Sequence, residues 1–185
     1  MTTIGLARGT VQLQRYLPEW KTLFEQEAAL LRSVMGAEAQ HVEHIGSTAI
    51  VGMTAKPIID LVVLVRSLNE AGVWIPTLSS LGYEHRANDD VSDRLFLAKG
   101  PRSRRTHHLS LAEAKSNFYR EKLLFRDYLS SHREAFDEYL RLKKELALRH
   151  PDDRDSYTKG KQGFVERIIR LATETSATAA YFVRR

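Results

Sequence analysis

The chain has 185 residues and no cysteine, so it is long enough to bury a full hydrophobic core, and disulfide bonds and zinc–thiolate sites are excluded. Its 28 Lys and Arg exceed its 23 Asp and Glu, which gives a net charge of +5 and favours an anionic ligand. Because only 99–105 (KGPRSRR) forms a dense basic cluster, we expect a phosphate-bearing small molecule or nucleotide rather than a nucleic acid.

No segment predicts a membrane partner. The longest apolar run, 58–65, is of strand length and falls far short of the ~20 residues that a membrane-spanning helix needs. The amino terminus also lacks the apolar segment of a secretory signal. Together with the absence of cysteine, these features predict a cytoplasmic location, and no pattern predicts the oligomeric state.

The apolar pattern predicts an α+β fold in a single domain over 1–185, with a small mixed β-sheet within about 1–111 flanked by helices, and a C-terminal helical cap over about 112–185. In chain order the predicted elements are a helix from Pro18 to Gly36, strands over 41–45 and 58–65, a helix over 67–81, a short strand over 83–86, a hairpin of strands 94–99 and 104–111, and helices over 118–129, over 131–148 and from about 155 onward. The tail 173–185 has only a weak pattern.

Local signals mark several of these boundaries. Two Ser-x-x-Glu sequences, at 67–70 and 131–134, match the capping box and predict helix starts. Gly82 is expected to end the first of these helices, and the sequence HPDD at 150–153 is expected to end the second.

The most informative stretch is VEHIGSTAIVGMTAKPIIDLVV, residues 42–63. An apolar run ends in Gly46-Ser47, a turn of small residues follows, and a second apolar run contains Asp60, which predicts a strand, a tight loop and a strand. The backbone N–H groups of Gly46 and Ser47 can approach an anion, and Lys56 can reach the loop as a point charge for phosphate. The alternatives are an ordinary turn and a solvent-exposed lysine.

These residues carry a family resemblance. Gly-Ser, about a dozen residues and then Asp in a strand resembles the signature of the polymerase-beta-type nucleotidyltransferase superfamily, and the full string resembles the GrpB-like family, a branch of it. FRDYL at 125–129 and YTxxK at 157–161 match further segments of that family, so that the resemblance covers about 16–172. It implies a nucleotidyltransferase-like fold and an NTP as a substrate. The family also occurs fused to dephospho-coenzyme A kinases, which suggests nucleotide or coenzyme chemistry.

Asp60 is the strongest single candidate. A carboxylate within an apolar strand must be ligated, paired or at an edge. In a nucleotidyltransferase it would hold a divalent metal, Mg²⁺ or Mn²⁺, with Zn²⁺ as a further option if His108 is a second ligand. The alternative is a buried salt bridge from Asp60 to an Arg or to His108.

The metal-binding pattern is incomplete, however. Two-metal phosphoryl transfer requires carboxylates at alternate positions of one strand and a third on a neighbouring strand. Val62 stands two residues after Asp60, no acid occurs in 105–111, and Ser110 replaces the last His of the family's HHLHV.

A polar set remains around the predicted strands, and it consists of Glu43, His44, Asp60, His107, His108 and Ser110. It could bind a metal through mixed nitrogen and oxygen ligands, supply a general base, or consist partly of packed core histidines. Because side chains alternate along a strand, only one of Glu43 and His44 is expected to join Asp60, and His107 is expected on the face opposite His108.

In the helical half, Arg126 and Lys161 could clamp a phosphate or carboxylate, unless they pair with surface acids. Two functions therefore remain open. One is a metal-dependent nucleotidyltransferase that transfers a nucleotidyl group from an NTP to a small acceptor, with Asp60, His108, His44 and Glu43 as catalytic candidates. The other is a catalytically degenerate module that binds nucleotide or phosphate through Gly46, Ser47, Lys56, Arg126 and Lys161.

Overall fold

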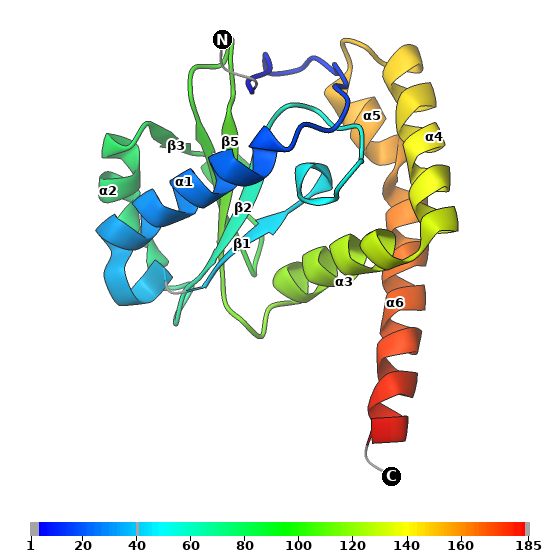
Figure 1. Ribbon diagram of the computed structural model, residues 1–185. Helices are drawn as coiled ribbons and strands as arrows, with labels where there is room; N and C mark the ends of the chain where they lie inside the picture. Colours follow the sequence, from blue (N-terminus) through cyan, green and yellow to red (C-terminus); the bar gives the residue numbers. More distant parts are fainter. Residues whose placement is uncertain (1–3, 40, 184–185) are drawn as a thin grey trace.

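The computed structural model describes residues 4–39 and 41–183. Five strands form one mixed sheet in the order β1-β2-β5-β4-β3 (Figure 1). The strands are β1 Val42–Ile45, β2 Ile59–Leu64, β3 Tyr83–His85, β4 Leu95–Lys99 and β5 His107–Ala112. β2 and β5 are parallel, and the other neighbours are antiparallel. The expected mixed sheet and the hairpin of β4 and β5 are confirmed.

Helices cover both faces of this sheet. They are α1 Glu19–Met35, α2 Ile75–Ser80, α3 Asn117–Ser131, α4 Arg133–Arg149, α5 Arg154–Gly160 and α6 Gln162–Val183. In Figure 1, α1 crosses one face, α3 lies on the other side, and α4, α5 and α6 pack together next to α3. Over the described ranges, no helix is sufficiently long and apolar to cross a bilayer.

The strand register assigns each side chain to a face. Leu61 and Leu109 pair on the face covered by α1, where they join the largest hydrophobic cluster. Asp60 pairs with His108 on the opposite face, which α3 approaches. The alternation expected for 105–111 is therefore confirmed.

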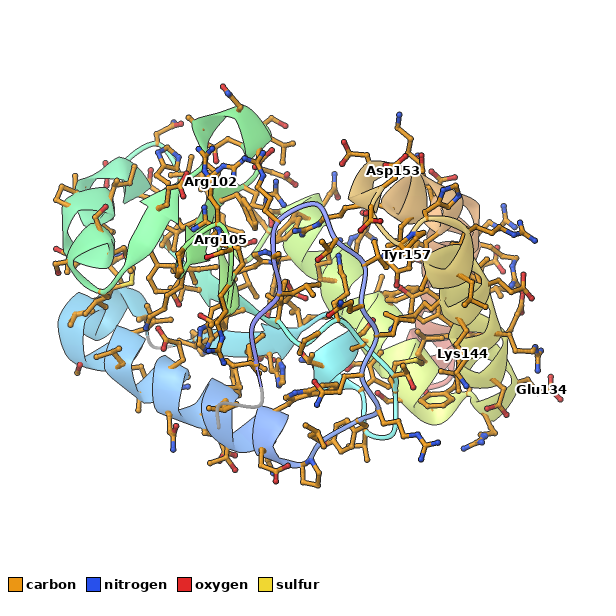
Figure 2. The ribbon with its side chains drawn as sticks, turned by 90° about the horizontal axis from the view of Figure 1, so that it is seen from above. Arg102, Arg105, Glu134, Lys144, Asp153 and Tyr157 are labelled. Atoms are coloured by element: carbon orange, nitrogen blue, oxygen red, sulfur yellow. The ribbon has the colours of Figure 1, made fainter. Side chains whose placement is uncertain are left out.

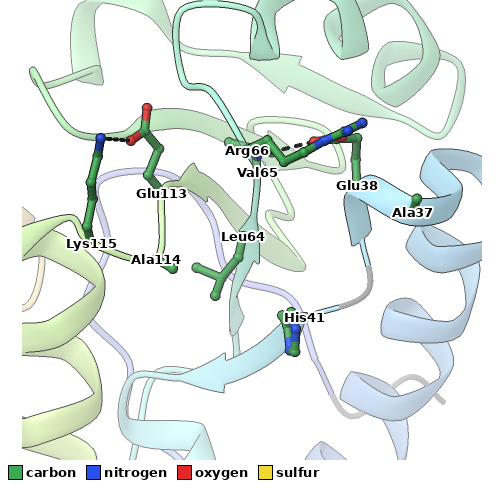
Figure 3. Close-up of a pocket in the computed structure, with 9 residues that line it drawn as sticks. All are labelled: Ala37, Glu38, His41, Leu64, Val65, Arg66, Glu113, Ala114 and Lys115. Atoms are coloured by element: carbon green, nitrogen blue, oxygen red, sulfur yellow. Dashed lines mark hydrogen bonds and ion pairs between the residues drawn. The ribbon is translucent and has the colours of Figure 1, made fainter.

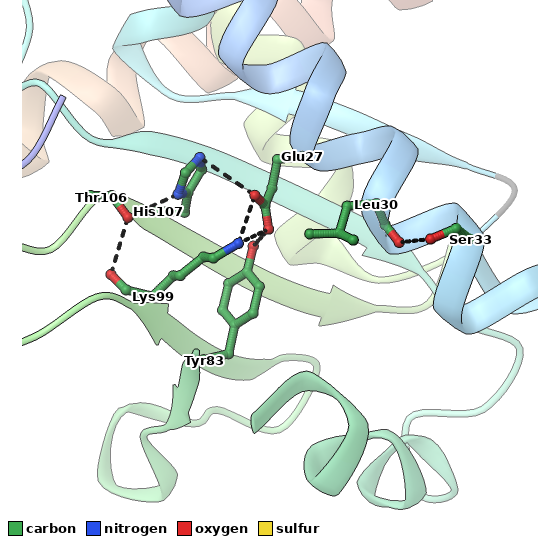
Figure 4. A network of polar contacts seen from close by, with 7 residues as sticks. All are labelled: Glu27, Leu30, Ser33, Tyr83, Lys99, Thr106 and His107. Atoms are coloured by element: carbon green, nitrogen blue, oxygen red, sulfur yellow. Dashed lines mark hydrogen bonds and ion pairs between the residues drawn. The ribbon is translucent and has the colours of Figure 1, made fainter. Parts of the chain in front are cut away.

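His107 lies under α1, in a polar network (Figure 4). The Glu27 carboxylate accepts hydrogen bonds from the Tyr83 hydroxyl at 2.9 Å and from Lys99 Nζ at 2.7 Å, and His107 Nε2 lies 3.9 Å from it. Burial lowers the pKa of His107 to about 4 and outweighs the opposing effect of Glu27, so the ring is neutral at pH 7. His107 is a polar residue of the core on the α1 side.

The N-terminal segment 4–15 connects the sheet to the helical cap, and it is the loop that passes over the centre of Figure 2. On the sheet side, Gly5 N–H donates to Pro57 O at 2.8 Å. On the helical side, Val11 N–H donates to Pro151 O at 2.7 Å, and Gly9 O accepts from Arg154 N–H at 3.1 Å. The segment thereby fixes the start of α5 relative to the loop before β2.

Several predicted boundaries are wrong. The helix expected over 67–81 is a 3₁₀ turn, Ala71–Trp74, followed by the short α2, because Pro76 fits only the first turn of a helix. The capping box at 131–134 does not form. Ser131 ends α3, where its Oγ donates to Asp127 O at 2.8 Å, and His132 precedes α4 without a side-chain cap.

The C-terminal helix also differs from the prediction. It begins at Arg154, with the Asp153 carboxylate accepting from Ser156 N–H, and it is interrupted at Lys161, so that α5 and α6 are separate. Much of the weakly patterned tail is helical up to Val183, and 184–185 lie outside the described residues. β5 starts at His107, three residues later than predicted.

Candidate anion-binding site

A cavity of about 640 Å³ lies between the Asp60 face of the sheet and the helical cap. Its walls come from the loop between β1 and β2, the strands β2, β4 and β5, and the helices α3 to α6. Seven of the predicted residues line it: Gly46, Ser47, Lys56, Asp60, His108, Ser110 and Lys161. Figure 2 shows Tyr157 of α5 on the helical side of this region. The predicted convergence of the loop, β2 and β5 is confirmed.

Gly46 allows the loop to approach Asp60. Its φ of +72° is a left-handed value that side-chain-bearing residues rarely adopt, and a Cβ at Gly46 would lie 2.5 Å from Asp60 Oδ2. The glycine therefore permits both the turn and the close contact with the carboxylate.

Gly46→Ala is expected to destabilise the protein by about 2 kcal/mol or more, because the new methyl group adds a steric clash to backbone strain. Urea denaturation would measure the change. Gly163→Ala is the matched control, since Gly163 stands in α6 and no atom lies within 4 Å of the position that a Cβ would take there. Equal effects of the two substitutions would contradict this account.

Asp60 and His108 form a hydrogen-bonded pair, with 2.9 Å between Asp60 Oδ1 and His108 Nδ1. Burial raises the pKa of Asp60, but the His108 hydrogen bond and the charges of His108, Lys56 and Arg154 outweigh it, so the pKa is below its usual value. An ionised carboxylate only accepts hydrogen bonds, so Nδ1 carries the proton and Nε2 is left as an acceptor in a neutral ring. Asp60 therefore forms the pairing with His108 that we expected as the alternative to metal binding.

The cavity has a strong excess of positive charge. Its acidic lining residues are Asp60, Glu121 and Glu166. Its basic lining residues are Lys56, Arg94, Lys122, Lys143, Arg154, Lys159 and Lys161. Within the described part of the chain, Lys56, Lys143 and Lys161 form no ion pair, so their charge is available to a ligand.

Lys56 and Lys161 flank the ring of the buried Tyr157, with Nζ 5.4 Å and 4.3 Å from its centroid. Burial, and then the charges of Arg154 and Lys161, lower the pKa of Lys56 to about 7. Burial and neighbouring cations likewise lower the pKa of Lys161 to about 8, against the opposing effect of Asp60. Both amines are therefore partly unprotonated near neutral pH.

Lys143 is the most deeply buried of these lysines, with 2% of its surface exposed. Its Nζ donates a hydrogen bond to Thr54 O and lies 5.1 Å from the centroid of the Tyr139 ring. Burial, followed by the charges of Lys161 and Lys56, places the pKa of Lys143 well below its ordinary value.

Three predicted residues do not reach the cavity lining. Arg126 Nη1 donates to Glu43 Oε2 at 3.0 Å and to His44 O at 2.9 Å, and its Nε donates to Asp127 Oδ1 at 2.7 Å. Arg126 is thus paired with acids, as the alternative interpretation held. Glu43 lies on the Asp60 side of the sheet, but it binds this arginine.

His44 points to the opposite face, as strand alternation requires. Its ring stacks on Phe24, with centroids 4.7 Å apart, and its Nε2 lies 3.0 Å from Thr48 Oγ1. Burial lowers the pKa of His44 to about 4, and its ring is therefore neutral at pH 7. The His44 side chain of β1 therefore packs against α1.

Lys143, Arg154 and Tyr139 were not found from the sequence. One signal for Lys143 was available, because Phe136, Tyr139, Lys143 and Leu146 form the buried stripe of α4. A lysine within such a stripe indicates a buried cation. No comparable signal marks Arg154, whose position depends on the N-terminal segment.

The residues present offer few metal ligands. Across residues 4–39 and 41–183, no group of three or more His, Asp or Glu is placed to hold a metal ion. Val62 is fully buried beside α3, and Ser110 is 4% exposed. On the sheet side of the cavity, Asp60 and His108 are therefore the carboxylate and imidazole donors that a metal could use.

A second hollow, of about 570 Å³, lies at the opposite end of β2 and β5 (Figure 3). Its charged side chains pair with one another, Arg66 with Glu38 and Lys115 with Glu113 at 3.2 Å. Glu113 Oε1 also accepts from Leu68 N–H at 3.0 Å. Because its charges are already compensated, this hollow is a weaker candidate for a charged ligand than the lysine-rich cavity.

Comparisons with known proteins agree with this fold. A family model described as GrpB protein matches residues 10–171. The glutamate-rich protein GrpB of Alkalihalophilus pseudofirmus is 35% identical over 170 residues, which cover 90% of this chain and 98% of that protein. The crystal structure of conserved protein GrpB from Enterococcus faecalis superimposes with a TM-score of 0.82 at 34% identity, covering 89% of this chain and 99% of that one.

Two further relatives are longer than the matched region. UPF0157 protein YqkA of Bacillus subtilis is 36% identical over 156 residues, 84% of this chain, but the chain spans only 45% of its length. A protein named dephospho-CoA kinase from Mycolicibacterium paratuberculosis is 27% identical over 198 residues, and 48% of that protein is matched.

Proposed function

The chain belongs to the GrpB family, and we propose that its lysine-rich cavity binds a phosphate-bearing small molecule, of the size of a nucleotide. The observation that supports this most strongly is a group of three lysines without ion pairs, the buried Lys143 and the partly buried Lys56 and Lys161, in the cavity that Asp60 lines. Burying cations without partners is costly, and an anionic ligand removes that cost when it binds.

The cavity has charged and apolar parts, which suit the phosphate groups and the organic moiety of such a ligand. The lysines, together with Arg154, provide the charge for phosphate groups, and Arg154 can donate two parallel hydrogen bonds. Phe96, Phe125 and Val165 line the same cavity and provide apolar surface for an organic moiety. The ligand class agrees with the cytoplasmic location that we propose from the composition.

Titration calorimetry with ATP and with pyrophosphate tests this function. Lys161→Met should weaken the binding of both ligands about tenfold to a hundredfold, because a charge-assisted contact contributes about 1.5–3 kcal/mol. Lys144→Met is the matched control, since Lys144 is exposed on α4 and does not line the cavity (Figure 2). Unchanged affinity in Lys161→Met would contradict the proposal.

A second candidate function is nucleotidyl transfer, and the Asp60–His108 pair favours it. Asp60 holds the proton on His108 Nδ1, so that Nε2 can accept a proton from an attacking hydroxyl group. In the alternative arrangement, Nε2 binds a divalent metal and cannot act as the base. Asp60 and His108 then fit the metal only if phosphate oxygens of the nucleotide complete the ligand set, and Mn²⁺ or Zn²⁺ suits such mixed donors better than Mg²⁺. The metal would supply charge stabilisation at the transferred phosphorus.

We rank phosphate binding first, as the function of a degenerate member of the superfamily, because Val62 and the acid-free β5 leave Asp60 as the one strand carboxylate in the cavity lining. The dephospho-CoA kinase name of the Mycolicibacterium relative supports nucleotide-related chemistry in either case. Release of pyrophosphate from NTPs in the presence of Mn²⁺ would favour the transferase.

The affinity for ATP should fall about tenfold between about pH 7.5 and about pH 9.5. Phosphate groups are fully ionised in this range, since their second pKa is about 6, so the ligand charge is constant. Lys56 and Lys161, with pKa values of about 7 and about 8, lose their protons instead. Calorimetric titrations across this range would measure the decline, and a constant affinity would show that neither lysine binds phosphate.

A further inference from the structure

Lys56 stands out among the cavity lysines because its backbone is fixed on both sides. Ala55 exchanges two hydrogen bonds with Gln14, at 2.9 Å and 2.8 Å. Pro57 O accepts from Gly5 N–H at 2.8 Å, and Ile58 N–H donates to the carbonyl of Lys56 itself at 2.8 Å. The side chain therefore leaves a rigid segment and lines the cavity.

The surroundings of the Lys56 amine favour its neutral, nucleophilic form. The charges of Arg154 and Lys161 act on it, the aromatic ring of Tyr157 forms one wall, and no carboxylate pairs with it in the described part of the chain. Its pKa of about 7 leaves a large unprotonated fraction at neutral pH. Lysine amines become nucleophiles when they are desolvated or placed beside another cation.

The neighbouring lysines are less suited to this role. Lys143 is 2% exposed and its Nζ is hydrogen-bonded to Thr54 O, so the nitrogen has little room to form a covalent bond, although its charge still acts on an anion in the cavity. Lys161 has the higher pKa, about 8, and lies closer to the Tyr157 ring. Lys161 and Arg154 are instead placed to bind an anionic group next to Lys56.

We propose that Lys56 forms an imine with the carbonyl carbon of a phosphorylated aldehyde, whose phosphate is bound by Lys161 and Arg154. This inference rests on the proposed phosphate-binding function and assigns a reactive group to the same cavity. It names the ligand class as small molecules that carry both a phosphate and an aldehyde.

The step is balanced without any further reactant. The lone pair of the neutral amine forms a C–N bond to the carbonyl carbon, and the C=O π electrons move to oxygen. One proton passes from nitrogen to that oxygen through water, which gives a carbinolamine. Loss of the hydroxyl group with a second proton, as water, leaves the C=N bond. One amine and one aldehyde thus give one imine and one water, and no atom is oxidised or reduced.

Pyridoxal 5′-phosphate is a suitable probe, because it combines an aldehyde with a phosphate. The full-length protein is incubated with the probe and reduced with borohydride, and the labelled lysine is located by peptide mass spectrometry. We expect one label per chain, on Lys56. Lys56→Arg keeps the positive charge but cannot form an imine, so it should lose the label. Lys144→Arg should be labelled like the unsubstituted protein.

Competition in the unsubstituted protein gives a second test that requires no variant. Pyrophosphate should protect Lys56 from the probe in proportion to its occupancy of the cavity. A label spread over exposed lysines, a label that survives in Lys56→Arg, or no protection by bound pyrophosphate would overturn the imine assignment.

The two proposals can fail separately. If pyridoxal without its phosphate labels Lys56 as readily as pyridoxal 5′-phosphate does, the amine is reactive but the phosphate-binding function is wrong. If pyrophosphate binds and depends on Lys161, yet no lysine is labelled, the phosphate-binding function stands and the imine is wrong.

Discussion

Replacing Lys143 with Met is expected to raise the free energy of unfolding at pH 7 by about 2 kcal/mol and to weaken ATP binding at least about tenfold. Lys143 is buried, and its pKa is well below the value in an unfolded chain, so folding has to neutralise or bury its charge. Met fills similar space without that cost, although the hydrogen bond to Thr54 O is lost.

The lowered pKa of Lys143 also determines how the stability of the protein depends on pH. Because the folded pKa of Lys143 is depressed, the unfolded state binds more protons below the ordinary lysine pKa, and the stability of the unsubstituted protein should rise as the pH rises from 7 toward 10.5. The advantage of Lys143→Met should shrink over that range.

Urea denaturation and titration calorimetry measure the two effects of Lys143→Met. Lys144→Met, one residue away and exposed, should change neither quantity by more than about 0.5 kcal/mol. Opposite changes in stability and binding are characteristic of a binding residue, whereas a structural lysine would lose stability when replaced. A destabilised Lys143→Met protein with normal ATP affinity would contradict the proposed role.

Replacing Asp60 with Asn is expected to remove any enhancement of ATP binding by Mn²⁺. In the unsubstituted protein the carboxylate and the ATP phosphates together offer oxygen ligands to the metal, and we expect Mn²⁺ to tighten ATP binding about tenfold or more. Asn keeps the shape of Asp60 but not its charge. Its amide can still bond His108, so the fold should be retained.

The effect of the metal on binding is measured as the difference in ATP affinity with and without Mn²⁺. Its effect on transfer is measured as the pyrophosphate released from ATP. Asp127→Asn is the control, because this exposed carboxylate pairs with Arg126 and does not line the cavity. If Asp60→Asn keeps the metal effect and all pyrophosphate release, Asp60 is a packed polar residue. The transferase candidate would then be dropped in favour of phosphate binding alone.

The sheet side of the cavity could be predicted because its information is local. The spacing of Gly46, Ser47 and Asp60 lies within one strand–loop–strand segment, and strand alternation placed His108 on the Asp60 face and His107 on the other. The correct pairing of two strands then brings these groups together without any reference to the helices.

The helical side depends on packing between distant segments, which no local pattern encodes. Arg154 and Lys143 face Lys56 only because α4 and α5 pack across the cavity, with the N-terminal segment between them and the sheet. Arg126 was predicted to bind a ligand and does not line the cavity. Its charge and the family-like sequence around it suggested a phosphate-binding residue, but its guanidinium is already paired with Glu43 and Asp127.

The helix boundaries were missed for a related reason. Ser67 and Ser131 both begin a capping-box sequence, but tertiary structure used these residues otherwise: Ser131 became the last residue of α3, and the chain after Ser67 remained irregular up to Ala71. Capping signals have energies of about 1 kcal/mol, so packing can override them.

Proton uptake during ATP binding tests most directly whether the cavity lysines form a binding site for phosphate. Calorimetric titrations at about pH 8.5, in two buffers with different heats of ionisation, report the protons taken up for each ATP bound. ATP is fully ionised there, so any proton must come to the protein. Because Lys56 and Lys161 have pKa values of about 7 and about 8 in the free protein, we predict an uptake of about one proton or more, lost in large part in Lys56→Met. Binding without proton uptake, or the same uptake in Lys56→Met, would contradict the account.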